Sequence, residues 1–76
     1  MNLTKIQQEK IRSEFKLSKR EMDCLVAIFA GIVKDEDIAK QLKIDIRTAK
    51  GYLRKIYMKT RTGKKISAVL KCIELL

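Results

Sequence analysis

The side chains of this sequence that could do chemistry are cations, and they are concentrated in one segment. Ten of the 18 lysine and arginine residues lie between Lys40 and Lys65, where Asp45 is the single acid. Residues 1–39 and 66–76 are each neutral, so the 40–65 segment carries the whole formal net charge of +9. A cluster of positive charges without interspersed acids attracts a polyanion, and its lysine and arginine side chains donate strong hydrogen bonds to the oxygens of that polyanion. The segment therefore predicts an anionic partner, with nucleic acid first and an acidic protein or an anionic membrane surface as alternatives.

Groups suited to catalysis or to holding a metal ion are scarce. The sequence has no histidine and no glycine-rich phosphate loop, and its two cysteines, Cys24 and Cys72, are spaced for neither a metal cluster nor a redox pair. We expect both cysteines to be reduced and buried in the core. The sequence therefore predicts a protein that is not an enzyme and that binds no metal, cofactor or small-molecule ligand.

The sequence also lacks a segment for insertion into a membrane. No apolar run approaches the ~20 residues that span a bilayer, and the segment from Met1 to Phe15 is too polar for the apolar part of a signal peptide. We therefore expect a cytoplasmic protein.

The composition predicts an all-α fold around these cations. The 76 residues suffice for one small domain, proline is absent, and Lys, Leu, Ile, Glu and Ala are frequent, which favours helices over strands. Between Leu3 and Glu14 the apolar residues do not form a continuous stripe, so we expect residues 1–16 to be an arm or a short helix. Residues 17–76 are predicted to form a four-helix helix-turn-helix domain, to which the arm could add a helix.

Two helices are predicted ahead of the basic segment. Ser18-Lys19-Arg20-Glu21 has the form of a capping box, which places a helix over residues 19–30. Gly31 suits the left-handed conformation that ends a helix. Three consecutive acids at residues 35–37 favour the start of a second, short helix, because they lie beside its exposed amide groups. This second helix leads directly into the basic segment.

The basic segment is predicted to contain a turn and a longer helix. Lys43-Ile44-Asp45 forms the turn, with Ile44 in the core and Asp45 capping a helix over residues 46–59. At about 100° per residue, one arc of this helix collects Ala49, Leu53, Ile56 and Thr60, and the opposite arc collects Arg47, Lys50, Gly51, Arg54, Lys55 and Met58. No acid follows Asp45 until Glu74, so ion pairs within the helix do not explain the basic arc. We therefore expect the basic arc to contact phosphates and bases.

A last helix is predicted over residues 64–75, and its apolar positions cover more than half of its circumference. A surface helix buries a narrower face than this, so a second partner must cover part of it. We expect a two-fold dimer contact through Ile66, Val69, Leu70 and Ile73. The alternative is that the N-terminal arm covers this surface within one molecule.

Several short motifs occur in an order that is typical of one known family. They are Leu17-Ser18-x-Arg20-Glu21, then Ile38-Ala39-x-x-Leu42-x-Ile44, then Arg47-Thr48-x-Lys50 with Leu53, Ile56-Tyr57 and Lys59. From Leu17 to Val69 the sequence resembles the LuxR-type DNA-binding domain of bacterial transcription regulators, also called NarL-type or FixJ-type. The resemblance implies a four-helix domain whose third helix lies in the major groove of double-stranded DNA and whose fourth helix commonly mediates dimerisation. Two positions where the family usually has glycine hold Lys43 and Arg61 here.

Carried over residue by residue, the resemblance implies roles for the helix over residues 46–59. The base-reading positions are Lys50, Gly51 and Arg54, of which Arg54 is the strongest candidate for specificity because arginine can donate to guanine O6 and N7. The residues expected near phosphates are Arg47, Thr48 and Lys59, together with the basic residues Lys43 and Lys55.

Three functions remain open at this point. The first is sequence-specific DNA binding by a transcription regulator, as a homodimer on two half-sites about one helical turn apart. The second is a promoter-recognition module that resembles region 4 of a sigma factor and needs RNA polymerase. The third is a protein-interaction module that uses the basic arc to bind an acidic protein.

Overall fold

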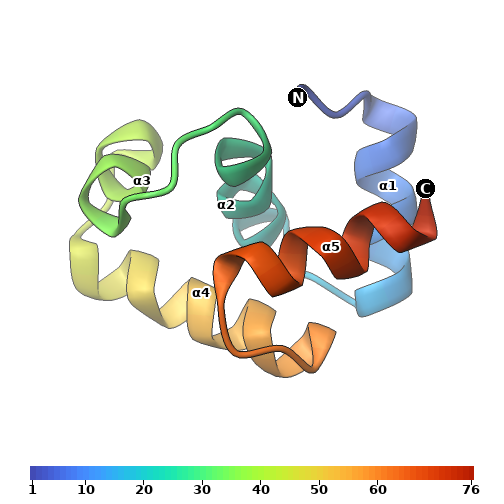
Figure 1. Cartoon of the computed structure of the whole chain (residues 1–76). Helices are drawn as coiled ribbons and strands as arrows, with labels where there is room; N and C mark the ends of the chain where they lie inside the picture. The colour runs from blue at the N-terminus through green and yellow to red at the C-terminus, as the bar shows by residue number, and fades with distance from the viewer.

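Five helices and no strand make up the protein in a computed structural model that describes residues 1–76. The helices are α1 (Lys5–Phe15), α2 (Lys19–Phe29), α3 (Asp35–Leu42), α4 (Ile46–Thr60) and α5 (Lys65–Leu75). α2 packs against all four other helices, and α4 packs against α2, α3 and α5 (Figure 1). The predicted all-α helix-turn-helix fold, with an additional N-terminal helix, is confirmed.

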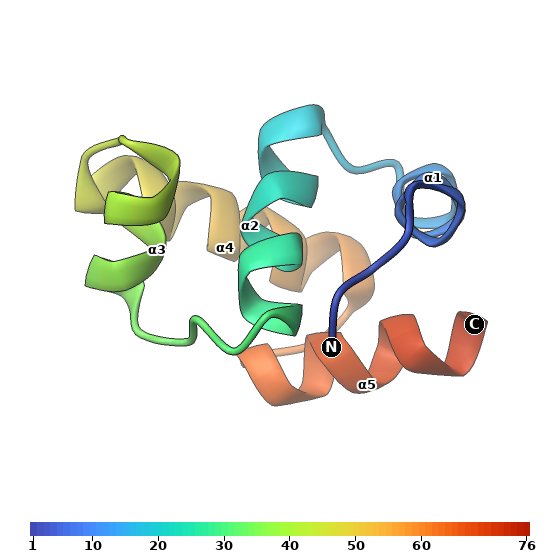
Figure 2. The same ribbon diagram turned by 90° about the horizontal axis from the view of Figure 1, so that it is seen from above.

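The hydrophobic core surrounds α2. Seen from above, α2 lies between α3 on one side and α1 on the other (Figure 2). Each helix contributes at least one side chain with no solvent exposure, and these include Ile11, Leu25, Ile38, Ile56 and Cys72. None of the five helices has both the length and the apolar character needed to cross a membrane.

The N-terminal arm forms a regular helix, α1, that belongs to this core. Thr4 caps it, because the Thr4 hydroxyl accepts a hydrogen bond from the Gln7 N–H at 3.1 Å and Gln7 Oε1 accepts one from the Thr4 N–H at 3.0 Å. This is a capping box of the kind that the sequence Thr4-x-x-Gln7 could have revealed. Ile11 and the preceding Leu3 are buried in the common core, so the weak apolar stripe is sufficient to dock the arm.

The predicted start and stop signals of α2 are confirmed. The Ser18 hydroxyl accepts from the Glu21 N–H at 3.2 Å, and Glu21 Oε1 accepts from the Ser18 N–H at 3.0 Å. Gly31 has a φ of 98° and lies in the left-handed region. α2 ends at Phe29, one residue earlier than expected, and α5 begins at Lys65, one residue later than expected; such differences are within ordinary fraying of helix ends.

The turn between α3 and α4 is also confirmed, and it contains an unfavourable backbone conformation. Asp45 Oδ1 accepts from the Arg47 N–H at 2.8 Å and caps α4. Ile44 is half-buried and is not among the side chains packed against the core, so its predicted place in the core is wrong. Lys43 and Arg61, which replace glycines of the family pattern, have φ values of 56° and 57°. Both therefore retain the left-handed conformation that glycine would adopt without steric cost.

We expect Arg61→Gly to raise the free energy of unfolding by about 1 kcal/mol, because a left-handed residue with a Cβ is strained by roughly 1–2 kcal/mol and the greater freedom of unfolded glycine offsets part of the gain. Urea denaturation followed by circular dichroism measures the change. A loss of stability would show that the Arg61 side chain contributes more than its backbone strain costs.

Candidate nucleic-acid interface

α4 has the two faces that its sequence predicted. Ala49, Leu53, Ile56 and Thr60 are all buried, with at most 3% of each residue exposed. The Thr60 hydroxyl donates to the Ile56 carbonyl at 2.8 Å, so this buried polar group has a partner. The opposite arc is open to solvent, with Gly51 half-exposed and the remaining residues exposed, namely Arg47, Lys50, Arg54, Lys55 and Met58.

The cations on this outer arc have no acidic partner within the molecule. The structure contains four ion pairs: Glu9 with Arg12, Asp23 with Arg20, Glu21 with Lys59, and Asp35 with Lys65. None of them involves Arg47, Lys50, Arg54 or Lys55. Since unpaired cations on one helix face repel one another, this arrangement favours an external anion.

The three predicted base-reading residues share this outer arc. Lys50 and Arg54 are one helical turn apart, and Gly51 lies beside them on the same side of α4. Lys50 and Arg54 also line an open hollow between α3 and α4, together with Asp35, Leu53 and Tyr57. The donors of both basic side chains can therefore approach one ligand from neighbouring turns.

Four of the five predicted phosphate-contacting residues surround the start or the outer arc of α4. Arg47 and Thr48 lie in its first turn, Lys43 lies in the preceding turn, and Lys55 lies on the outer arc; all four are exposed. The Asp45 carboxylate already accepts from the Arg47 N–H at this helix start, so a phosphate here would be bound by the side chains of Arg47 and Thr48 rather than by the terminal amide groups. These assignments stay predictions.

The side chain of Lys59, the fifth predicted phosphate contact, already has hydrogen-bond partners within the protein. Its Nζ donates to Glu21 Oε1 at 2.6 Å and to the Lys16 carbonyl at 3.0 Å. The end of α4 is thereby fixed to the turn between α1 and α2. The structure thus gives Lys59 a positioning role, and its contact with phosphate stays a prediction.

The carboxylate of Glu21 is the buried partner of this contact. Only 3% of Glu21 is exposed, and Oε1 accepts hydrogen bonds from both the Ser18 N–H and Lys59 Nζ. Burial acts to raise the pKa of Glu21, but the hydrogen bonds from Lys59 and Ser18 and the positive charges of Lys59 and Lys55 outweigh it and lower the pKa. Glu21 is therefore ionised at neutral pH and holds Lys59 in place.

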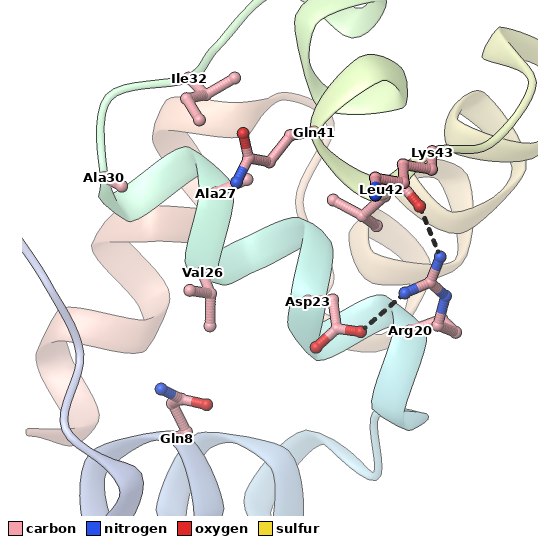
Figure 3. A pocket seen from close by; sticks show the side chains of 10 residues that line it. All are labelled: Gln8, Arg20, Asp23, Val26, Ala27, Ala30, Ile32, Gln41, Leu42 and Lys43. Carbon is pink, nitrogen blue, oxygen red and sulfur yellow. Dashed lines mark hydrogen bonds and ion pairs between the residues drawn. The ribbon is translucent and has the colours of Figure 1, made fainter.

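Arg20 positions the turn that precedes α4. Its Nη2 donates to the Leu42 carbonyl at 2.9 Å and its Nη1 donates to Asp23 Oδ2 at 3.1 Å (Figure 3). The Leu42 carbonyl belongs to the last residue of α3, where carbonyls lack partners within the helix. The surrounding hollow lies between Gln8 of α1 and Gln41 of α3 and contains no residue of α4. Arg20 therefore fixes the end of α3, from which the turn leads into α4.

A third link joins the starts of α3 and α5. Lys65 Nζ lies 2.6 Å from Asp35 Oδ1, and about a quarter of each side chain is exposed. Burial raises the pKa of the neighbouring Tyr57, an effect that the charge of Lys65 opposes and that of Asp35 reinforces. Tyr57 is therefore un-ionised at neutral pH and packs against the core next to this pair.

The predicted dimer residues of α5 divide into two groups. Ile66, Leu70 and Ile73 are 61%, 54% and 45% exposed, whereas Val69 is half-buried and packs against the core. α1 packs against α5, and Ala68 and Cys72 of α5 are buried in the core that α1 shares. The N-terminal arm therefore helps to bury the inner face of α5 and leaves an apolar stripe on its outer face.

Both cysteines are core residues, as expected. Cys24 and Cys72 have no solvent exposure, and burial raises the pKa of each thiol to about 11. The thiols are therefore protonated at neutral pH, and an uncharged thiol is a poor nucleophile and metal ligand.

A comparison with family models identifies the family of this chain. The model described as bacterial regulatory proteins, LuxR family (GerE) matches residues 16–72. The chain belongs to this family. LuxR-family domains of this type are DNA-binding and act in transcription regulation, which agrees with the exposed cations of α4. Comparisons with curated proteins and with solved structures gave no significant match.

Acid should weaken the Glu21–Lys59 link of this LuxR-family domain. Because the pKa of Glu21 is lowered from its ordinary value of 4.5, its stabilising effect is complete above that value and is lost as the pH falls through the folded-state pKa. We expect Glu21→Gln to lower the free energy of unfolding by about 2 kcal/mol at pH 7, less than for a fully buried pair because Lys59 is partly exposed. Urea denaturation from pH 7 to 3 should show the two proteins converging in acid. A difference that stays constant from pH 7 to 3 would contradict the ionic role of Glu21, because glutamine can still accept from the Ser18 N–H.

Proposed function

We propose that this chain is a sequence-specific transcription regulator that inserts α4 into the major groove of double-stranded DNA. The observation that carries this proposal is the set of unpaired cations on the outer arc of α4, namely Arg47, Lys50, Arg54 and Lys55. The helix backbone that carries these cations is fixed in position because the opposite arc of the same helix is buried in the core. A rigid helix with cations on its exposed side suits base reading better than a mobile charged segment does.

The dimensions of α4 support docking in a groove. An α-helix with its side chains is about 10–12 Å wide, and the major groove of B-DNA is about 12 Å wide and 8.5 Å deep. Arg54 and Lys50 would donate to guanine O6 and N7, while Arg47, Thr48, Lys43 and Lys55 would contact phosphates on either side. Phosphate contacts supply affinity that falls with salt, and base contacts supply sequence preference.

The outer face of α5 supports dimerisation. Ile66, Leu70 and Ile73 are spaced by four and three residues, so they form one stripe on α5. Apolar residues that are exposed together on one face favour a self-complementary contact about a two-fold axis. A dimer would place two copies of α4 on half-sites about one helical turn apart.

For the DNA-reading role, we expect Arg54→Ala to weaken binding to the preferred duplex by about 1–3 kcal/mol and to reduce its preference over a scrambled duplex. The preferred duplex is first selected from a random library, and both duplexes are then titrated by fluorescence anisotropy at two salt concentrations. Lys64→Ala is the matched control, because it removes one exposed positive charge outside α4. This control should weaken both duplexes equally and slightly.

Two outcomes would contradict the proposal in different ways. If no sequence is enriched, and a preference arises only when RNA polymerase is added, the promoter-recognition alternative is favoured. If binding is weak on every duplex and Arg54→Ala behaves like Lys64→Ala, the cations serve an acidic protein partner instead.

For the dimer, we expect Leu70→Glu to give a monomer in sedimentation equilibrium, because a carboxylate would lose its hydration in an apolar contact. Ile6→Glu is the matched control, since Ile6 lies on α1, is 83% exposed, and should leave the mass unchanged. A wild-type chain that stays monomeric both free and on its preferred duplex would contradict the role of α5.

A further inference from the structure

Neither the backbone conformation nor the packing of the free protein explains why position 51 holds a glycine. It lies inside α4, where its backbone is helical and its φ is not positive, unlike that of Gly31. A Cβ at position 51 would meet no heavy atom within 4 Å. Neither a special turn nor close packing within the molecule therefore requires glycine here.

This glycine weakens the helix that carries it. In a helix interior, glycine is less favourable than alanine because the unfolded chain gains freedom and the helix backbone is left open to water. α4 is the longest helix of the protein and makes extensive contacts with three others. A residue that weakens such a helix and has no packing role in the free protein points to a role in contact with a ligand.

The residues around Gly51 on the surface of α4 are cations. Arg47 lies one turn before it, and Arg54 and Lys55 lie one turn after it; all three are exposed and without an acidic partner. Gly51 is thus an opening in the side-chain surface, bordered by cations. Long basic side chains can reach a ligand from their own positions, whereas a bare position lets the backbone itself come close.

We propose that Gly51 is the point where α4 comes closest to the base edges, and that a side chain at this position would hold the helix away from the DNA. This inference rests on the proposed DNA-reading function. A helix nearly as wide as the groove has little clearance over its floor. Removing one side chain at the deepest point lets the helix sit lower and brings Lys50 and Arg54 within reach of the bases. Gly51 is therefore a specificity-determining residue through the absence of its side chain.

The test compares Gly51→Ala and Gly51→Leu with the wild-type chain. We expect both variants to unfold at a higher temperature, by about 3–8 °C for alanine, because alanine and leucine favour the helix. We expect affinity for the preferred duplex to fall about tenfold with alanine and further with leucine, while affinity for a scrambled duplex changes less than twofold. A gain in stability combined with a loss of specific binding excludes misfolding as the cause.

Gly63→Ala is the matched control. Gly63 lies in the loop before α5, and a Cβ there would also meet no heavy atom within 4 Å. This variant should bind both duplexes as the wild-type chain does. If Gly51→Ala keeps wild-type affinity for the preferred duplex, the inference is wrong although the proposed function stands. If the wild-type chain shows no preference among duplexes, the proposed function itself fails and the inference falls with it.

Discussion

The ion pair between Glu21 and Lys59 fixes the part of the molecule on which the proposed DNA-binding surface depends. It joins residues 38 positions apart and ties the end of α4 to the start of α2. At the other end of α4, Asp45 caps the first turn and Arg20 holds the last carbonyl of α3. Contacts near both ends of α4, together with the packing of its buried arc, therefore hold the helix in place. A helix held in this way presents its outer side chains in one geometry, which base reading requires.

The same arrangement connects the proposed DNA-binding surface to the apolar stripe of α5. Asp35 at the start of α3 pairs with Lys65 at the start of α5, and α5 packs against both α2 and α4. A partner molecule seated on Leu70 and its neighbours would thus lie on a helix that is rigidly joined to α4. In a dimer, the spacing between two copies of α4 would then depend on the packing of α5 rather than on a flexible linker.

Local signals predicted most of the fold, and long-range contacts could not be predicted. The capping box at Ser18, the turn after Leu42 and the two arcs of α4 were identified because each depends on residues within about two helical turns. The link from Arg20 to the Leu42 carbonyl spans 22 residues, and nothing in the spacing indicates which lysine would meet Glu21. For the same reason, Lys59 could be assigned to a phosphate from its position in the family pattern but not to Glu21. The exposure of the outer arc was predictable because it follows once the inner arc of the same helix is buried.

The distribution of glycine around α4 has a consequence for how this domain tolerates change. Lys43 and Arg61 adopt the left-handed conformation that suits glycine, while Gly51 occupies a helical position that suits alanine. The backbone could therefore support a more stable sequence than the present one, and the difference is concentrated in α4 and its two ends rather than in the core. Selection for thermal resistance alone would act first on these positions. At Gly51, such selection would oppose the proposed DNA-reading role, so heat tolerance would be gained at the expense of occupancy of the DNA site.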